Sequence, residues 1–359
     1  MNWLQQFIQQ ATQRFFPFSE EMIRRKYTIH LDAWEESQLT SRPPRQRWSN
    51  ESLTAEHESA VQALLAHVRQ SHKPPARSSL SIVDAFLIAL LAFDRERYDV
   101  YVANGQTEWV KPLMGSDSVV VFERLDEPTL AIQPLVAGDM VLFNWHDVVV
   151  MHYLTAVDSE QQQFYTHTGK KVPFEAIHSR LAAVLFTKPP DNLELVTPPA
   201  QEHQRIAVDV WQDNLFRPEV PRDKPTPHSA ISLEQDDRLD WRLLRRLMRE
   251  HNGDVWPEIA NTNSMEPFLD AGTALLFERL DEENLLAQPL HAGDIVNWGN
   301  GQFGRLHRII GRGVDEQYYI KGDNNRSVDH LSGRRLIANT LIRHRVAGIV
   351  YTQQQRPGD

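Results

Sequence analysis

The stretch FERLDEPTLAIQPLVAGDMV at residues 122–141 occurs again at residues 277–296 as FERLDEENLLAQPLHAGDIV. The two stretches agree at 14 of 20 positions without a gap, and they are 155 residues apart. Agreement at this level does not arise by chance, and self-similarity at a fixed offset indicates one structural unit used more than once. The sequence therefore predicts an internal duplication.

The repeat extends beyond these two stretches in both directions. At the same offset, Pro112 corresponds to Pro267 and His152 to His307. Each copy closes with a similar segment, IHSRLAAVLFTK at 177–188 and IRHRVAGIVYTQ at 342–353, where the offset has grown to 165. The second copy therefore has about ten additional residues between its histidine and its last segment.

Both copies contain short apolar segments that are rich in β-branched residues and bounded by polar or glycine-containing turns, which is typical of strands. The predicted strands are 118–122, 140–143, 148–153 and 183–186 in the first copy, and 274–277, 294–298, 305–310, 317–321 and 346–351 in the second. Helices are predicted before each copy at 82–97 and 238–250, the second ending at His251-Asn252-Gly253. The expected fold class is α+β, mainly β, with two tandem, partly closed β modules.

The predicted organisation has five parts. These are a helical N-terminal region at 1–79, a first module at 80–188, a linker at 189–235, a second module at 236–353 and a tail at 354–359. Eight of the 21 prolines lie between about 188 and 235, which is typical of an extended linker. Residues 204–216 interrupt this linker and are a candidate strand.

Composition excludes several classes of function. The formal net charge of -10 argues against a protein that neutralises phosphates, so no nucleic-acid partner is expected, although Arg242, Arg245, Arg246 and Arg249 could form a local basic patch. The absence of cysteine excludes disulfides, thiolate nucleophiles and cysteine–zinc sites. No metal or cofactor is expected.

No segment reaches the roughly 18–20 uninterrupted apolar residues of a membrane span. The N-terminus also lacks the basic start and apolar run of an export signal. Residues 3–16 place apolar side chains on one helical face, which would either dock onto the protein body or lie in the plane of a membrane. The expected location is cytoplasmic, with peripheral membrane contact through residues 3–16 as the alternative.

Four short motifs of the second copy occur in a fixed order. They are Asn263-Ser264-Met265-Glu266-Pro267, Gly293-Asp294-Ile295-Val296, Leu306-His307-Arg308-Ile309 and Lys321-Gly322-Asp323-Asn324-Asn325, followed by Asp329. A serine hydroxyl needs a nearby base to become a nucleophile, and histidine suits that role because its ordinary pKa is near 6.5. A carboxylate can then fix the histidine tautomer. Ser264 is the predicted nucleophile and His307 the predicted base.

This ordered set resembles the signal peptidase and LexA-type serine peptidases (S24/S26), and among them the archaeal and endoplasmic-reticulum branch. That branch has an S-M-x-P motif, a G-D-[IV]-V strand, a His-Arg-[IV] motif, and K-G-D-N-N with a second Asp six residues after the first. The match covers about 261–330, and the shared β framework reaches about 352. The resemblance implies a serine peptidase in which Asp329 orients His307 and Asp323 supports the site.

The resemblance also assigns residues around the nucleophile. Acyl transfer needs donors for the developing oxyanion, and the backbone N–H of Ser264 is one candidate. Thr262 stands where the family commonly has a serine that can help, Met265 is expected beneath the nucleophile, and Pro267 is expected to fix the turn after it. Bacterial signal peptidases and LexA-like repressors use lysine where this chain has His307, so a Ser–Lys mechanism is not expected.

The first copy lacks most of these groups. Ser264 corresponds to Trp109 and Met265 to Val110, whereas His152 is retained. The stretch 165–169 that corresponds to the region of Asp323 contains no carboxylate. The first copy is therefore predicted to be catalytically inactive, and to brace the second copy, present substrate or pair with it.

Two functions from different classes remain open. The first is a serine endopeptidase that cleaves a leader, a pro-segment or a partner protein, so that the expected partner is a polypeptide substrate. The alternative is a non-catalytic module that binds an extended peptide in the same groove by strand addition. An autocleaving repressor would need a DNA-binding head, and residues 1–79 show no clear basic recognition helix.

Overall fold

The structure is a computed structural model. It describes residues 28–29, 76–103, 113–114, 117–145, 148–158, 160–166, 169–188, 225–235, 237–260, 262–299, 304–312, 317–325, 329 and 337–353. The predictions made for residues 3–16, 204–216 and 354–359 lie outside these ranges. Within them, no helix is long and apolar enough to cross a membrane.

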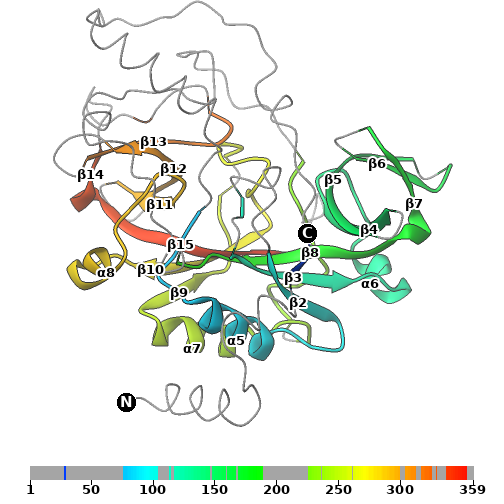
Figure 1. The fold of residues 1–359 in the computed structure, drawn as a ribbon, viewed down its shortest axis with the longest axis horizontal. Coiled ribbons are helices and arrows are strands. Elements are labelled where there is room, and N and C mark those ends of the chain that lie inside the picture. Colours follow the sequence, from blue (N-terminus) through cyan, green and yellow to red (C-terminus); the bar gives the residue numbers. More distant parts are fainter. Residues whose placement is uncertain are drawn as a thin grey trace, which may run out of the picture.

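The same order of elements occurs twice along the described chain (Figure 1). The first half contains α5 (Ile82–Ala92), β2 (Tyr98–Ala103), β3 (Val119–Arg124), α6 (Glu127–Ile132), β4 (Met140–Trp145), β5 (Val148–Asp158), β6 (Gln163–Thr166), β7 (Lys171–Pro173), η1 (Phe174–Ala176) and β8 (Ile177–Leu185). The second half contains α7 (Trp241–Glu250), β9 (Gly253–Trp256), β10 (Thr273–Arg279), α8 (Glu282–Ala287), β11 (Ile295–Trp298), β12 (Arg305–Arg312), β13 (Gln317–Lys321), β14 (Ile337–Ala338), η2 (Asn339–Leu341) and β15 (Ile342–Tyr351). The fold is mainly antiparallel β with few helices, as predicted.

Three local predictions need correction. The helix predicted at 82–97 ends at Ala92, because Phe93 forms a bridge with Leu239 and the chain then turns into β2, a strand that the sequence did not predict. The short helices α6 and α8 were also missed, although Asp126 and Asp281 cap them through their side chains. Within the N-terminal region that was predicted to be helical, residues 28–29 form strand β1 (Thr28–Ile29), which pairs in parallel with β2.

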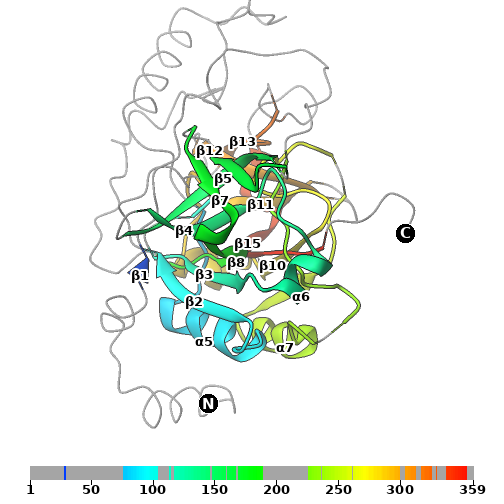
Figure 2. The same ribbon diagram turned by 90° about the vertical axis from the view of Figure 1, so that its right-hand side faces the viewer.

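Within the described residues, the fifteen strands form one connected sheet. Its centre runs β9–β10–β15–β8–β3–β2, and α5 and α7 lie side by side below it in Figures 1 and 2. The long strands β15 and β8 also pair with β11 and β4, which lead into the outer strands β12–β14 and β5–β7. These outer groups stand on opposite sides of the centre in Figure 1.

The two halves meet through β8 and β15, which pair antiparallel in a symmetric way. Val184 lies opposite Ile349, its own counterpart at the offset of 165. On either side, Leu185 pairs with Gly348 and Ala183 pairs with Val350. At the offset of 165, Ala183 corresponds to Gly348 and Leu185 to Val350, so each of these pairs is the counterpart of the other. This is the arrangement of a two-fold (isologous) contact within one chain. Gly348 is required there, because a Cβ atom would lie 2.8 Å from the Val184 carbonyl oxygen.

Both halves contribute to the two central hydrophobic clusters. One lies with the helices and includes Phe86, Leu185, Leu244, Leu247 and Leu276. The other includes Leu142, Met151, Met265, Phe268 and Ile349. Two further clusters each belong to one half, around Phe143 and Phe164 in the first and around Trp298 and Ile320 in the second. The halves therefore share their principal core and bury apolar area against one another.

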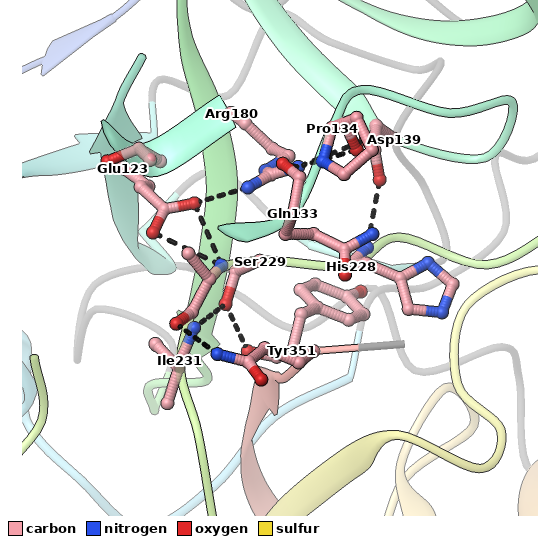
Figure 3. A network of polar contacts seen from close by, with 12 residues as sticks. Glu123, Gln133, Pro134, Asp139, Arg180, His228, Ser229, Ile231 and Tyr351 are labelled. Atoms are coloured by element: carbon pink, nitrogen blue, oxygen red, sulfur yellow. Dashed lines mark hydrogen bonds and ion pairs between the residues drawn. The ribbon is translucent and has the colours of Figure 1, made fainter. Parts of the chain in front are cut away.

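Each half contains a buried arginine with the same partners. Arg180 donates to Glu123 at 2.6 Å and lies 3.5 Å from Asp139 (Figure 3). Its Nη1 also donates to the carbonyl oxygens of Gln133 and Pro134. In the second half, Arg345 has the equivalent partners Glu278, Asp294, Gln288 and Pro289. Such buried charges are tolerated because they are paired and hydrogen-bonded.

A backbone segment from the other half completes each of these networks. The Ala230 N–H donates to Glu123 of the first half, whereas Ser229 Oγ donates to the Tyr351 carbonyl oxygen of the second (Figure 3). Correspondingly, the Ser79 N–H donates to Glu278 and Ser78 Oγ donates to the Phe186 carbonyl oxygen. Residues 226–231, which the sequence assigned to the linker, are buried and bind both halves.

Burial shifts the pKa values of several titratable groups in and beside these networks. Burial raises the pKa of Asp139 to about 6, and the charge of Arg180 opposes this shift. Burial also raises the pKa of the Asp294 carboxyl to about 6, and the charge of Arg345 opposes this shift. Burial, and then the charge of Arg180, lower the pKa of His228 to about 4.

Removing one buried arginine should destabilise the protein. Arg180→Met leaves Asp139 buried without its cation and Glu123 with Arg238 alone, so we expect the free energy of unfolding to fall by about 3–5 kcal/mol, measured by denaturant titration. The control Arg124→Met breaks the half-exposed pair with Asp99 and should cost at most about 1 kcal/mol. Equal losses in the two variants would contradict the role given to the buried network.

His228 should make the protein sensitive to acid. Because its folded pKa lies below its unfolded value near 6.5, its contribution to stability is complete above pH 6.5 and is lost as the pH falls towards 4. The difference between these pKa values corresponds to about 3 kcal/mol. Unfolding titrations from pH 7 to 4 should show that His228→Gln loses less stability than the wild type. Parallel curves would show that this histidine is not buried in its neutral form.

Candidate active site

The residues of the candidate site come from three parts of the second half. Ser264 lies in a turn over 264–268 between β9 and β10, and His307 is on β12. Asp329 follows β13, and its backbone N–H donates to the Ile320 carbonyl oxygen at 2.8 Å. Asn263, immediately before the serine, has φ of 55°, a conformation that asparagine tolerates better than most residues.

His307 and Asp329 form a close pair. The distance from His307 Nδ1 to Asp329 Oδ2 is 2.5 Å, and each residue is 7% exposed. The same carboxylate oxygen accepts a hydrogen bond from Trp298 Nε1 at 3.0 Å. A carboxylate at Nδ1 selects the tautomer that carries its proton there, which leaves Nε2 of His307 as the basic nitrogen.

The turn after β13 connects the histidine with the serine loop. Asn325 Nδ2 lies 3.5 Å from His307 Nε2. Asn324 donates from its backbone N–H to the Ser264 carbonyl oxygen and from its side chain to the Asn263 carbonyl oxygen, both at 2.8 Å. A Cβ atom on Gly322 would lie 2.6 Å from the Ser264 carbonyl oxygen, so only glycine allows this approach.

Asp323 binds Arg308 rather than His307. Two parallel bonds of 2.8 and 2.7 Å join the carboxylate to the guanidinium, a strong bidentate geometry. Arg308 Nη1 also donates to the Gly293 carbonyl oxygen, and its guanidinium lies over the Phe268 ring. Asp323 therefore supports the site by holding the 321–325 turn against β12 and the serine loop.

Ser264 is half-buried, and its Oγ is 2.9 Å from Thr262 Oγ1. Within the described part of the chain, neither its Oγ nor its backbone N–H is hydrogen-bonded to His307 or to a carbonyl group. Nucleophile–base hydrogen bonds are often long in structures without substrate, so the role of Ser264 as nucleophile stays a prediction.

The residues that follow Ser264 anchor its loop in the shared core. Met265 is 3% exposed and belongs to the central cluster to which both halves contribute. Pro267 is buried within the same turn, and the Glu266–Pro267 peptide bond is cis. Tyr351 donates its hydroxyl to the Phe268 carbonyl oxygen at 3.0 Å. The serine loop thus rests on side chains from both halves.

The first half differs at the corresponding positions. His152 is buried and its ring is 5.3 Å from Phe143, which is the counterpart of Trp298. The side chain of Phe143 has no N–H group to donate. Trp109 and Val110, the counterparts of Ser264 and Met265, lie outside the described residues.

Sequence reasoning missed three participants. Trp298 lies two residues beyond the Gly293–Val296 motif, and its contact with Asp329 spans 31 residues of chain. Arg308 and Asn325 lie within motifs that were recognised, and their side chains can each donate several hydrogen bonds, which was a signal of a role in the site. The partners of all three side chains are brought close only by the folding of the chain.

The described residues contain no group of three or more histidine, aspartate or glutamate side chains that could hold a metal ion. No protein-family model matches the chain, and neither the curated proteins nor the solved structures contain a match.

Adding one methyl group at Gly322 should displace the serine loop. In Gly322→Ala the Cβ would collide with the Ser264 carbonyl oxygen, so the bond from Asn324 should weaken. We expect amide hydrogen exchange at Asn324 to accelerate while exchange in β10 and β15 is unchanged. The control Gly169→Ala, where no atom lies within 4 Å of the added Cβ, should leave Asn324 unaffected. Unchanged exchange in Gly322→Ala would disprove the close contact.

Proposed function

We propose that the protein is a serine endopeptidase of the signal-peptidase type, built from two tandem modules of which the second carries the site. The observation that supports this most directly is the bond from His307 Nδ1 to Asp329, because it leaves Nε2 as a base on the side of Asn325. The turn that contains Asn325 is bonded to the backbone of Ser264. Nucleophile, base and orienting acid are the three parts of a catalytic triad.

The proposed reaction uses these groups in sequence. His307 Nε2 removes the proton from Ser264 Oγ as this oxygen attacks the carbonyl carbon of the substrate. The Ser264 N–H stabilises the oxyanion, with help from the Thr262 hydroxyl. The imidazolium, stabilised by Asp329, then gives its proton to the departing amine. Water hydrolyses the acyl-enzyme with His307 as base in the second step.

The first half supports the site in this proposal without taking part in the chemistry. It carries the same buried arginine network and contributes to the core beneath Met265. Its histidine packs against Phe143 and not against an indole that holds a carboxylate. The first half would therefore be a pseudoenzyme module.

One observation favours the second candidate, a peptide-binding module. Ser264 Oγ is bonded to Thr262 and not to His307. If this hydroxyl pair persists when a peptide is bound beside it, the site would hold an extended chain without cleaving it.

A comparison of protein N-termini by mass spectrometry distinguishes the two functions. Cells that produce the wild type should contain a small set of N-termini that disappear in Ser264→Ala and His307→Gln at equal protein abundance. Loss of the base or the nucleophile of a triad removes about 10⁶ in rate, so no residual processing is expected. The matched control is His152→Gln in the first half, which should keep the full set. Identical sets in all four strains would favour peptide binding.

A further inference from the structure

The Trp298 indole has a hydrogen-bond partner, Asp329, that its burial in the core does not require. It is 1% exposed at the end of β11, within the cluster that belongs to the second half. Its Nε1 is directed at Asp329 Oδ2, the oxygen that also accepts from His307 Nδ1. A buried indole N–H needs an acceptor, but a backbone carbonyl would satisfy it equally well.

Two donors on one carboxylate oxygen have a geometric consequence. The bonds from Trp298 Nε1 and His307 Nδ1 restrict rotation of the carboxylate, so that Oδ2 stays in line with the imidazole. A carboxylate fixed in this way is what holds the proton of His307 on Nδ1.

The first half has the same buried arginine network but no tryptophan at the position of Trp298. Phe143 occupies the position of Trp298 on β4, and its ring packs directly on His152. Phenylalanine fills the core there, so the apolar role does not need an indole. The N–H group is therefore the feature that distinguishes the second half at this position.

We infer that Trp298 is a positioning residue, whose indole N–H fixes Asp329 and through it the tautomer of His307. This inference rests on the proposed function, because a fixed tautomer of His307 matters only if His307 acts as a base. The hydrogen bond from Trp298 to Asp329 can be observed whether or not the protein is a peptidase. Its role is indirect, because Trp298 contacts neither Ser264 nor His307 through a hydrogen bond.

The test is nuclear magnetic resonance of the full chain with ¹⁵N-labelled histidine. The His307 signals are assigned by their loss in His307→Gln, which is needed because the chain has 15 histidines. In the wild type at alkaline pH, the neutral ring should carry its proton almost entirely on Nδ1. In Trp298→Phe the population with the proton on Nε2 should rise several-fold.

The control is Trp256→Phe. Trp256 is a second-half tryptophan that packs against Phe277 and His344. It should leave the His307 tautomer unchanged, because it removes an indole without touching Asp329. An unchanged tautomer in a folded Trp298→Phe would overturn the inference, since a purely structural role for the indole predicts that result.

A second measurement covers the case in which Trp298→Phe does not fold. Exchange of the Trp298 indole proton with solvent should be at least about tenfold faster in Asp329→Ala than in the wild type, because the bonded carboxylate is gone. Equal exchange rates would overturn the inference. Neither readout requires turnover, so a failure of the peptidase proposal in the N-terminus comparison can be told apart from a failure of this one.

Discussion

The buried guanidinium of Arg345 is the contact on which the geometry of the second half depends. It joins β15 to Glu278 on β10 and to the loop that carries Asp294. From that loop the Gly293 carbonyl oxygen accepts a bond from Arg308, and Arg308 in turn holds Asp323 and the turn that touches Ser264. A charge in the core thus fixes the serine loop through a series of bonds, each of which would cost more to break than an exposed pair.

Much of the fold could be predicted from the sequence, because strands of a half-buried sheet repeat a recognisable apolar pattern and the repeat doubled the evidence. Strands β13 and β4 begin where the pattern placed them, at Gln317 and Met140. The burial of residues 226–231 could not be predicted. Pro227 and the preceding Pro225 are typical of a linker. The groups that bind this segment, Glu123 and the Tyr351 carbonyl oxygen, are more than a hundred residues away in the chain.

The candidate site follows a similar division. The contact of His307 with Asp329 was expected from the resemblance of four ordered motifs to a peptidase family, and the roles of Ser264, His307 and Asp329 stay predictions. The other contacts could not be predicted: Asp323 binds Arg308 and the indole of Trp298 reaches Asp329 only in the folded chain. The arginine frame is the same in both halves, whereas the groups around His307 and His152 differ.

The symmetric pairing of Val184 with Ile349 has a consequence for how such a molecule can vary. An assembly of two identical subunits must accept every substitution twice, once on each side of its axis, so a change that helps one site can damage the other. Joining both sides in a single polypeptide removes that restriction. One side is then free to hold phenylalanine where the other holds tryptophan, and a division of labour becomes accessible without loss of the common interface.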